Sequence, residues 1–323
     1  MRFSLELPIQ RVQHPEEFVT GDAVAELTRA AAAAGFSAVN VTDHPAPDTR
    51  WLDNGGHHTL DPFVALSFAA AAHPDIKLLT NIYVAAYRNP FLGAKLIQSI
   101  DVLSGGRLIL GVAAGYLKPE FASLGVDFDQ RAALLDDALE VLELTMSGAD
   151  VARTGSGYRA RGVRYRPMPP CGRRPPVWIG GNSQSAMRRA ARYDGWAPFH
   201  TAGFARASRT APIETVDELR GAIAFVRSMG STDDPDRPFD VCWSESLISD
   251  SEVSADERCA RVISLAAAAV TWTTVAIPGA SRAEVLEGIA GFGRDVIGAM
   301  WEEDRAYAHS PLGSRSPFLW LSR

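Results

Sequence analysis

The segment IKLLTNIYVAAYRNPFLGAKLIQSIDVLSGGRLILGVA (76–113) decides the fold. Its two ends, 76–84 and 107–113, are short and largely apolar without strict alternation, which is typical of strands covered on both faces. Between them, Pro90 opens a stretch with apolar residues at helical spacing, and proline is favoured in the first turn of a helix. The order strand, helix, strand predicts one parallel β/α unit.

The same alternation repeats along the whole chain. Helical stretches carry start and stop signals, among them Asp22 and the Asp61-Pro62 pair as expected starts and Gly35 as an expected stop. A doubly wound sheet usually has fewer strands and a Gly-x-Gly-x-x-Gly turn after the first, which this chain lacks. We therefore predict an α/β protein with a (β/α)8 TIM barrel. The expected strands are 2–7, 37–43, 76–84, 107–113, 176–181, 195–199, 239–247 and 271–277.

The chain has 323 residues, more than the ~250 of a typical barrel of this kind. We expect one domain over 1–323, with the additional residues in inserts and in a tail near 305–323. The segment 155–165 predicts a small hairpin with Gly162 near its turn. Inserts between barrel units are where substrate specificity is expected to lie. They are near 45–60, 147–175, 199–214 and 229–238.

Composition excludes several classes of protein. With 46% hydrophobic residues and a net charge of −6, the chain is neither disordered nor electrostatically suited to nucleic acid or an anionic membrane. Three cysteines cannot supply a disulfide scaffold, and no apolar run approaches the ~20 residues of a membrane span. The first residues lack the pattern of a signal peptide. We expect a cytoplasmic protein that acts on a small molecule.

Candidate functional residues are sought at the C-terminal ends of the strands, where barrels of this kind carry their chemistry. Asp43 and His44 end the second expected strand, and a carboxylate beside a histidine can fix its tautomer for proton transfer. The same pair could instead cap a loop and stack on Pro45. Asn81 follows Thr80 inside the third expected strand, where Asn is uncommon. It indicates either a local distortion of the strand or a polar contact inside the barrel.

Further candidates follow the fourth and fifth expected strands. The turn Gly180-Gly181-Asn182-Ser183 lies between a strand and a helix, where free amides can bind a phosphate, although such turns also occur without a ligand. The fourth strand ends in Ala113, Ala114, Gly115 and Tyr116. His57 and His58 lack metal-ligand spacing and no Gly-x-Ser-x-Gly elbow is present, so we predict neither a metal site nor a serine nucleophile.

Two segments resemble the bacterial luciferase-like superfamily of barrel oxidoreductases: RNPFLGAKLIQSIDVLSGGRLILGVAAGYLKPEFASLG (88–125) and PPVWIGGNSQSAMRRAARYDGWAP (175–198). The resemblance covers most of 1–198 and, more weakly, 273–292. It implies a flavin-type ring held at the strand C-termini. One branch transfers hydride with the deazaflavin coenzyme F420, and the other uses FMN with oxygen. The pair Asp43-His44 favours the F420 branch, which often has Asp-His at this turn, whereas the oxygenases tend to have Glu-His or His-His.

The resemblance also implies roles for individual positions. Asn81-Ile82 matches a non-proline cis peptide behind the middle ring of the deazaflavin, and His44 matches a proton-handling position beside Asp43. Tyr116 stands where the sugar-phosphate dehydrogenases of this branch carry a Glu, so a sugar phosphate is not expected; Tyr116 could donate a proton or form a wall beside the ring. The expected cofactor contacts are Asp43, Thr80, Asn81, Ile82, Ala113, Ala114, Gly115, Gly180, Gly181, Asn182 and Ser183.

The sequence therefore predicts an oxidoreductase that transfers a hydride between F420 and a small organic substrate. The alternative is an FMN-dependent monooxygenase that uses reduced flavin and O2. Two further readings are a protein that sequesters a flavin without turnover and a metal-dependent hydrolase on the same barrel. Because the superfamily is commonly dimeric through helices beside strands two to four, we also expect a homodimer.

Overall fold

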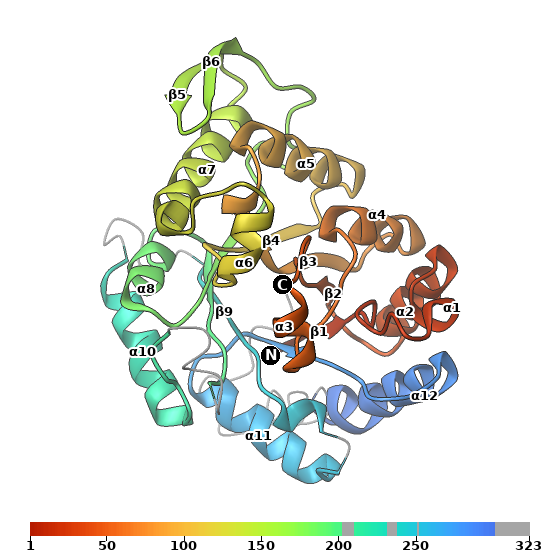
Figure 1. Cartoon of the computed structure of the whole chain (residues 1–323). Helices are drawn as coiled ribbons and strands as arrows, with labels where there is room; N and C mark the ends of the chain where they lie inside the picture. Colours follow the sequence, from red (N-terminus) through yellow and green to blue (C-terminus); the bar gives the residue numbers. More distant parts are fainter. Residues whose placement is uncertain (202–209, 231–237, 251, 301–323) are drawn as a thin grey trace.

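The computed structural model describes residues 1–201, 210–230, 238–250 and 252–300. Its centre is a closed barrel of parallel strands in the order β1-β10-β9-β8-β7-β4-β3-β2, which confirms the predicted TIM barrel (Figure 1). The strands are β1 (Arg2–Glu6), β2 (Ala38–Val41), β3 (Lys77–Val84), β4 (Leu108–Ala113), β7 (Val177–Gly180), β8 (Gly195–Ala197), β9 (Asp240–Trp243) and β10 (Trp272–Val275).

Helices surround the barrel (Figure 1). The longer ones are α2 (Gly21–Ala33), α4 (Pro62–Ala72), α5 (Pro90–Leu103), α7 (Arg131–Met146), α8 (Gln184–Ala190), α10 (Val216–Ser228), α11 (Ala255–Ala267) and α12 (Arg282–Phe292). Short segments between strands and helices are α1 (Pro15–Phe18), α3 (Thr49–Asp53), α6 (Lys118–Ser123), three 3-10 turns (Ala85–Tyr87, Phe128–Gln130, Leu247–Ser249) and a π-helical turn (Gly293–Gly298).

The helix ends follow the expected signals with one exception. Asp61 caps α4 by accepting hydrogen bonds from the amides of Phe63 and Val64, and Pro62 occupies the first turn as predicted. Helix α2 differs, because Thr20 and not Asp22 caps it, accepting a hydrogen bond from the amide of Ala23. Asp22 instead lies in the first turn, where a negative charge also favours the helix.

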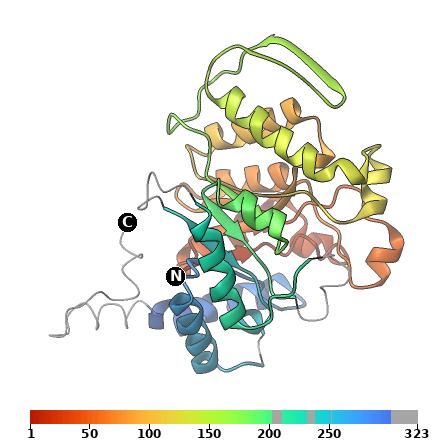
Figure 2. The same ribbon diagram turned by 90° about the vertical axis from the view of Figure 1, so that its left-hand side faces the viewer.

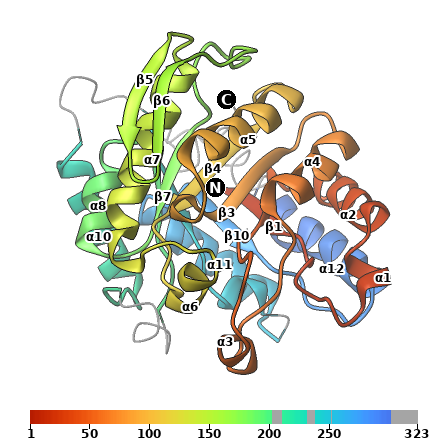
Figure 3. The same ribbon diagram turned by 45° about the horizontal axis from the view of Figure 1, so that its top comes forward.

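The insert 147–175 contains the predicted hairpin, formed by β5 (Val151–Gly155) and β6 (Tyr158–Val163) beside α7 (Figures 2 and 3). Gly162 lies within β6 and not in the turn, which runs through Gly157 at a φ of +76°. The insert 45–60 contains α3. The inserts 199–214 and 229–238 fall partly, and the tail 305–323 entirely, outside the described residues.

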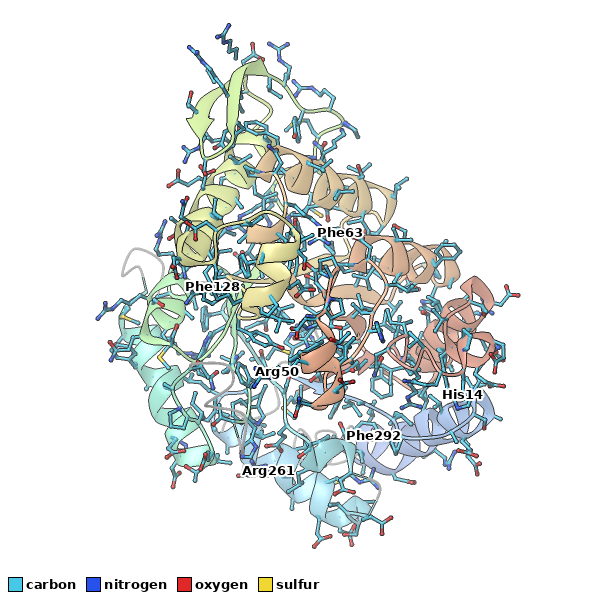
Figure 4. The ribbon with its side chains drawn as sticks, in the orientation of Figure 1. His14, Arg50, Phe63, Phe128, Arg261 and Phe292 are labelled. Carbon is cyan, nitrogen blue, oxygen red and sulfur yellow. The ribbon has the colours of Figure 1, made fainter. Side chains whose placement is uncertain are left out.

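Two layers of side chains hold the barrel together. Inside it, the rings of Trp178 and Trp272 lie 5.3 Å apart at the centre of a small apolar cluster. Between strands and helices lies a larger cluster that includes Phe63 of α4 and Phe292 of α12, both labelled in Figure 4. Among the described residues, no helix is both long and apolar enough to span a membrane.

The close approach of β3 to β4 requires a glycine. A Cβ added to Gly111 would lie 2.1 Å from the carbonyl oxygen of Thr80. The Thr80 hydroxyl in turn donates a hydrogen bond of 2.8 Å to the Gly111 carbonyl, and the pairing of β3 with β4 shifts register between Thr80 and Tyr83. Strand β3, which carries Asn81 and Ile82, can therefore approach β4 this closely only because residue 111 has no side chain.

Replacing Gly111 with Ala is expected to lower the free energy of unfolding by about 1–3 kcal/mol, because the methyl group collides with backbone and cannot be relieved by a rotamer change. Urea unfolding measures the difference. Gly221→Ala is the matched control, since an added Cβ at this position in α10 meets nothing within 4 Å. The control should be neutral or stabilising by up to about 1 kcal/mol; equal losses in both variants would contradict the prediction.

Candidate functional site

His44 lies just after β2 at the mouth of the barrel, meaning the end where the strands have their C-termini. Its Nδ1 atom lies 3.2 Å from Oε2 of Glu120, a fully buried residue of α6. The same carboxylate accepts hydrogen bonds from the Tyr87 hydroxyl at 2.7 Å and from the Ala46 amide at 2.9 Å. Glu120 therefore fixes the orientation of the imidazole. It also joins the segments that follow β2, β3 and β4.

Asp43 does not perform the orienting role that its position beside His44 suggested. Its carboxylate accepts two hydrogen bonds from the Arg88 guanidinium, at 2.7 and 2.9 Å, and a third of 3.0 Å from the Val84 amide. The side chain is 2% exposed, so burial raises its pKa, while the Arg88 charge opposes that rise. Asp43 anchors the end of β3, and contact between Asp43 and a cofactor stays a prediction.

Sequence reasoning missed Glu120 and Arg88, although both lie inside the segment 88–125 that carries the resemblance. No spacing rule connects them to His44 and Asp43, because the pairs are separated by 76 and 45 residues. Burial acts to raise the pKa of Glu120, but the hydrogen bonds from His44, Tyr87 and the Ala46 amide outweigh it and lower that pKa. Glu120 is thus a carboxylate suited to stabilise a positive charge on His44.

Aromatic rings surround His44. The Trp51 ring from α3 lies 4.4 Å from the imidazole, His57 lies 5.0 Å away and Tyr116 lies 6.2 Å away, measured between ring centroids. In Figure 4, Arg50 marks α3, which lies over the middle of the ring of helices. Trp51 and His57 both come from the insert 45–60, one of the inserts where substrate specificity is expected to lie.

Two of the rings around His44 are uncharged near pH 7. Burial, followed by the influence of His44, lowers the pKa of His57 to about 4, so this ring is neutral near pH 7. Its Nε2 atom lies 3.0 Å from the Thr42 hydroxyl. Burial and the Glu120 carboxylate raise the pKa of Tyr116 to about 12, so its hydroxyl keeps its proton. Tyr116 is therefore able to donate a hydrogen bond at neutral pH.

One side of the mouth is apolar and built from small residues, which we call the apolar side: Ile82, Gly111, Ala113, Gly180 and Ala197. The Asn81–Ile82 peptide is cis, as the resemblance implied. The Ile82 side chain lies where Cβ atoms on Gly111 or Gly180 would approach it to 3.0 and 3.2 Å. The apolar side thus consists of glycines, alanines and one isoleucine and carries no polar side chain.

Other predicted contacts have internal roles. Thr80 is fully buried and bonds Gly111. Ala114 packs against the outer core, and Gly115 has a φ of +83° where a Cβ would lie 2.6 Å from the Val84 side chain. These three residues pack within the protein behind the mouth. Direct contact between them and a cofactor stays a prediction.

The turn after β7 is also held from within. The Asn182 carboxamide is fully buried and forms two hydrogen bonds with the backbone of Phe199, at 2.8 and 3.1 Å. Ser183 caps α8 by accepting a hydrogen bond from the Ala186 amide. Gln184 and Ser185 are exposed residues, and their amides precede the first intrahelical hydrogen bond of α8. They are the groups at this turn that can reach an anion.

No metal centre is evident in the part of the chain that the structure describes, since it brings together no group of three or more His, Cys, Asp or Glu side chains suited to a metal ion. His57 approaches His44, but both rings are occupied by other contacts. The predicted site residues that lie together are His44 and Tyr116, joined by the unpredicted Glu120 and Trp51.

Solved structures with this architecture include flavin- and deazaflavin-dependent enzymes. The coenzyme F420-dependent tetrahydromethanopterin reductase of Methanopyrus kandleri superposes with a TM-score of 0.67 and 17% identity, covering 92% of this chain and 99% of that one. Residues 1–290 match the family model described as luciferase-like monooxygenase. The chain therefore belongs to the luciferase-like monooxygenase family, an oxidoreductase family, in agreement with the resemblance of its sequence.

Two curated relatives differ in what is known of them. An uncharacterized protein of Mycobacterium tuberculosis is 28% identical over 228 residues, which is 67% of this chain and 74% of the relative. The FMNH(2)-dependent dimethylsulfone monooxygenase of Pseudomonas fluorescens is 28% identical over 175 residues, covering 53% of this chain and 46% of the enzyme. Proteins named for either cofactor thus occur among those that this chain resembles, and the resemblance alone does not select one.

Replacing Arg88 with Met is expected to lower the free energy of unfolding by about 3–5 kcal/mol, because it leaves the Asp43 carboxylate buried without its partner. Chemical denaturation measures the loss. Arg220→Met is the control: Arg220 pairs with Asp217 on the exposed face of α10, and such pairs contribute at most about 1 kcal/mol. A loss at Arg88 no larger than at Arg220 would show that Asp43 needs no counter-charge.

Proposed function

We propose that this protein is an F420-dependent oxidoreductase that transfers a hydride between the deazaflavin and a small organic substrate. The observation that carries the proposal is the His44–Glu120 pair, which lies at the same end of the barrel as the apolar side. Hydride transfer to or from a polar double bond requires an accompanying proton, and an imidazole held by a buried carboxylate is a suitable donor and acceptor.

The residues at the mouth fit a deazaflavin. Ile82, Ala113 and Ala197 present apolar surface to a planar ring, and the exposed amides at the start of α8 suit an anionic tail. When bound, F420 supplies or accepts the hydride at its ring. His44 gives or takes the proton at the substrate heteroatom, Glu120 stabilises the imidazolium, and Trp51 shields the pair from water.

The second candidate is an FMN-dependent monooxygenase, which the match to the dimethylsulfone monooxygenase favours. The two candidates differ in cofactor and in the need for oxygen. Titrating the apo-protein with F420 and with FMN, followed by fluorescence, separates them. We expect micromolar binding of F420, worth about 8 kcal/mol, and much weaker binding of FMN. Tighter FMN binding together with oxygen-dependent turnover would replace the first proposal by the second.

His44→Asn is expected to slow oxidation of reduced F420 by a panel of ketones and enones about 10²–10⁴-fold, because the proton donor is lost while the apolar side is intact. Cofactor affinity, measured by fluorescence, should be unchanged. His14→Asn is the control, since His14 lies exposed before α1, far along the barrel rim (Figure 4). An unchanged rate in His44→Asn would remove the role assigned to this residue.

We also propose that the protein forms a homodimer through α4 and α5. Helix α4 is apolar on all of its faces, yet Val64 and Phe68 on it are 57% and 51% exposed, and Leu92 on the adjacent α5 is 58% exposed. Exposed apolar side chains gathered on neighbouring helices are typical of an interface. A second copy of the chain would cover them.

Phe68→Glu is expected to convert the dimer to a monomer in light-scattering measurements, because a charge would be buried at the interface. Phe225→Glu is the matched control: Phe225 lies on α10 and is 40% exposed, away from α4 and α5. The control should leave the dimer intact. A wild-type protein that is monomeric at micromolar concentration would contradict the proposal.

A further inference from the structure

Glu6 is the last residue of β1 and faces the inside of the barrel. Along this strand Phe3 and Leu5 pack outward into the larger core, so Ser4 and Glu6 point inward. The inward direction is confirmed at Ser4, whose hydroxyl accepts a hydrogen bond of 2.9 Å from the buried Asn40 side chain. Glu6 is the register partner of Asn40, and it therefore lies at the mouth above Ser4.

The mouth has a polar side opposite the apolar side, formed by Glu6, Asn40, Ser244 and Thr274. These residues belong to β1, β2, β10 and the end of β9, which are neighbours around the barrel. The Thr274 hydroxyl donates a hydrogen bond of 2.7 Å to the Ser244 hydroxyl, so these two satisfy each other. Glu6 is the one ionisable group among the four. A ring bound on the apolar side leaves the polar side for the substrate.

The charge of Glu6 is not neutralised by an ion pair. Gln10 donates a hydrogen bond of 3.0 Å to its Oε1 atom, which fixes the carboxyl group. Arg11 is the cation whose charge acts to lower the pKa of Glu6. Its guanidinium donates hydrogen bonds to the backbone carbonyls of Ile277 and Gly279, both at 2.6 Å. In the described ranges of the chain, no ion pair involving Glu6 is found. Burial raises the pKa of Glu6, and the charge of Arg11 opposes that rise without cancelling it.

Glu245, another acid close to the mouth, shows what a compensated carboxylate looks like in this barrel. It is 2% exposed at its side chain, and Arg261 binds both of its oxygens at 2.6 and 2.8 Å. The Trp243 indole donates a further hydrogen bond of 2.8 Å. Glu6 has one amide donor where Glu245 has a guanidinium and an indole, so its second oxygen is available to a ligand.

We propose that Glu6 recognises a protonated amine on the substrate. The proposal rests on the proposed function, since it assumes that the cofactor ring occupies the apolar side. An ammonium group supplies the positive charge and the hydrogen-bond donors that Glu6 lacks, and its pairing with a partly desolvated carboxylate is stronger than one at the surface. The preferred substrates are then amines that carry the reacting carbon a few bonds from the nitrogen.

Two ligands of the same shape test this assignment: piperidin-4-ol, which is an ammonium ion at neutral pH, and cyclohexanol, which is neutral. Binding to the F420-loaded protein is measured by calorimetry. We expect wild type to bind piperidin-4-ol at least about tenfold more tightly than cyclohexanol. In Glu6→Gln the two affinities should be equal within about threefold, whereas Glu6→Asp, which keeps the charge, should retain part of the preference.

Glu16→Gln is the matched control, because it removes the same charge from an exposed position on α1. It should keep the wild-type preference. Thermal unfolding checks each variant, and Glu6→Gln should be at least as stable as wild type, since it removes a charge that burial disfavours. A role of Glu6 in folding alone would leave the preference for the ammonium ligand unchanged.

Failure of this proposal is distinguishable from failure of the proposed function. Binding of F420 and of FMN to the wild-type protein is measured first. If neither cofactor binds, the proposed function is rejected. The two alcohols are also titrated into the protein without cofactor, so the comparison gives an answer in either case. Equal affinities in wild type, no binding of piperidin-4-ol, or a preference that survives in Glu6→Gln would each overturn the assignment to Glu6.

Discussion

The pairing of Asp43 with Arg88 is the interaction on which the mouth depends. It joins the residue after β2 to the segment between β3 and α5, and the Val84 amide adds a bond from the end of β3 itself. Because Asp43 is held in place, the backbone at the adjacent His44 has a fixed position. The His44 side chain can therefore reach the Glu120 carboxylate. Burying an ion pair of this kind costs free energy of desolvation. Its main effect here is therefore to fix the positions of the residues at the mouth and not to add stability.

The barrel was predictable because its signal is local. Continuous apolar runs such as 107–113, separated by helices with recognisable starts such as Asp61-Pro62, indicate the fold without knowledge of any long-range contact. The same locality explains the small errors. Thr20 and Asp22 are both good caps two residues apart, and only the path of the preceding chain selects Thr20. Gly162 and Gly157 both suit a turn, and strand pairing selects Gly157.

The site was predictable only as far as strand ends reveal it. His44, Tyr116 and the Asn81–Ile82 peptide follow from their positions on strands and from the resemblance. The partner of His44 does not, because Glu120 lies 76 residues away on a helix of six residues. A carboxylate adjacent in sequence looked like the natural partner, but Asp43 and His44 follow β2 and contact different neighbours, Arg88 and Glu120. Adjacent residues at a strand end are therefore poor evidence for contact.

The two sides of the mouth are assembled from different parts of the chain. The whole apolar side comes from residues 82–197, which form consecutive β/α units. The polar side brings Glu6 next to Thr274, and these belong to the first and last strands, paired through Ser4 and Thr274. The proposed surface for the ring therefore lies within residues 82–197 and does not involve the pairing of β1 with β10. The proposed substrate contact at Glu6, by contrast, is complete only when β1 pairs with β10. A molecule whose barrel has not closed would therefore not distinguish between substrates.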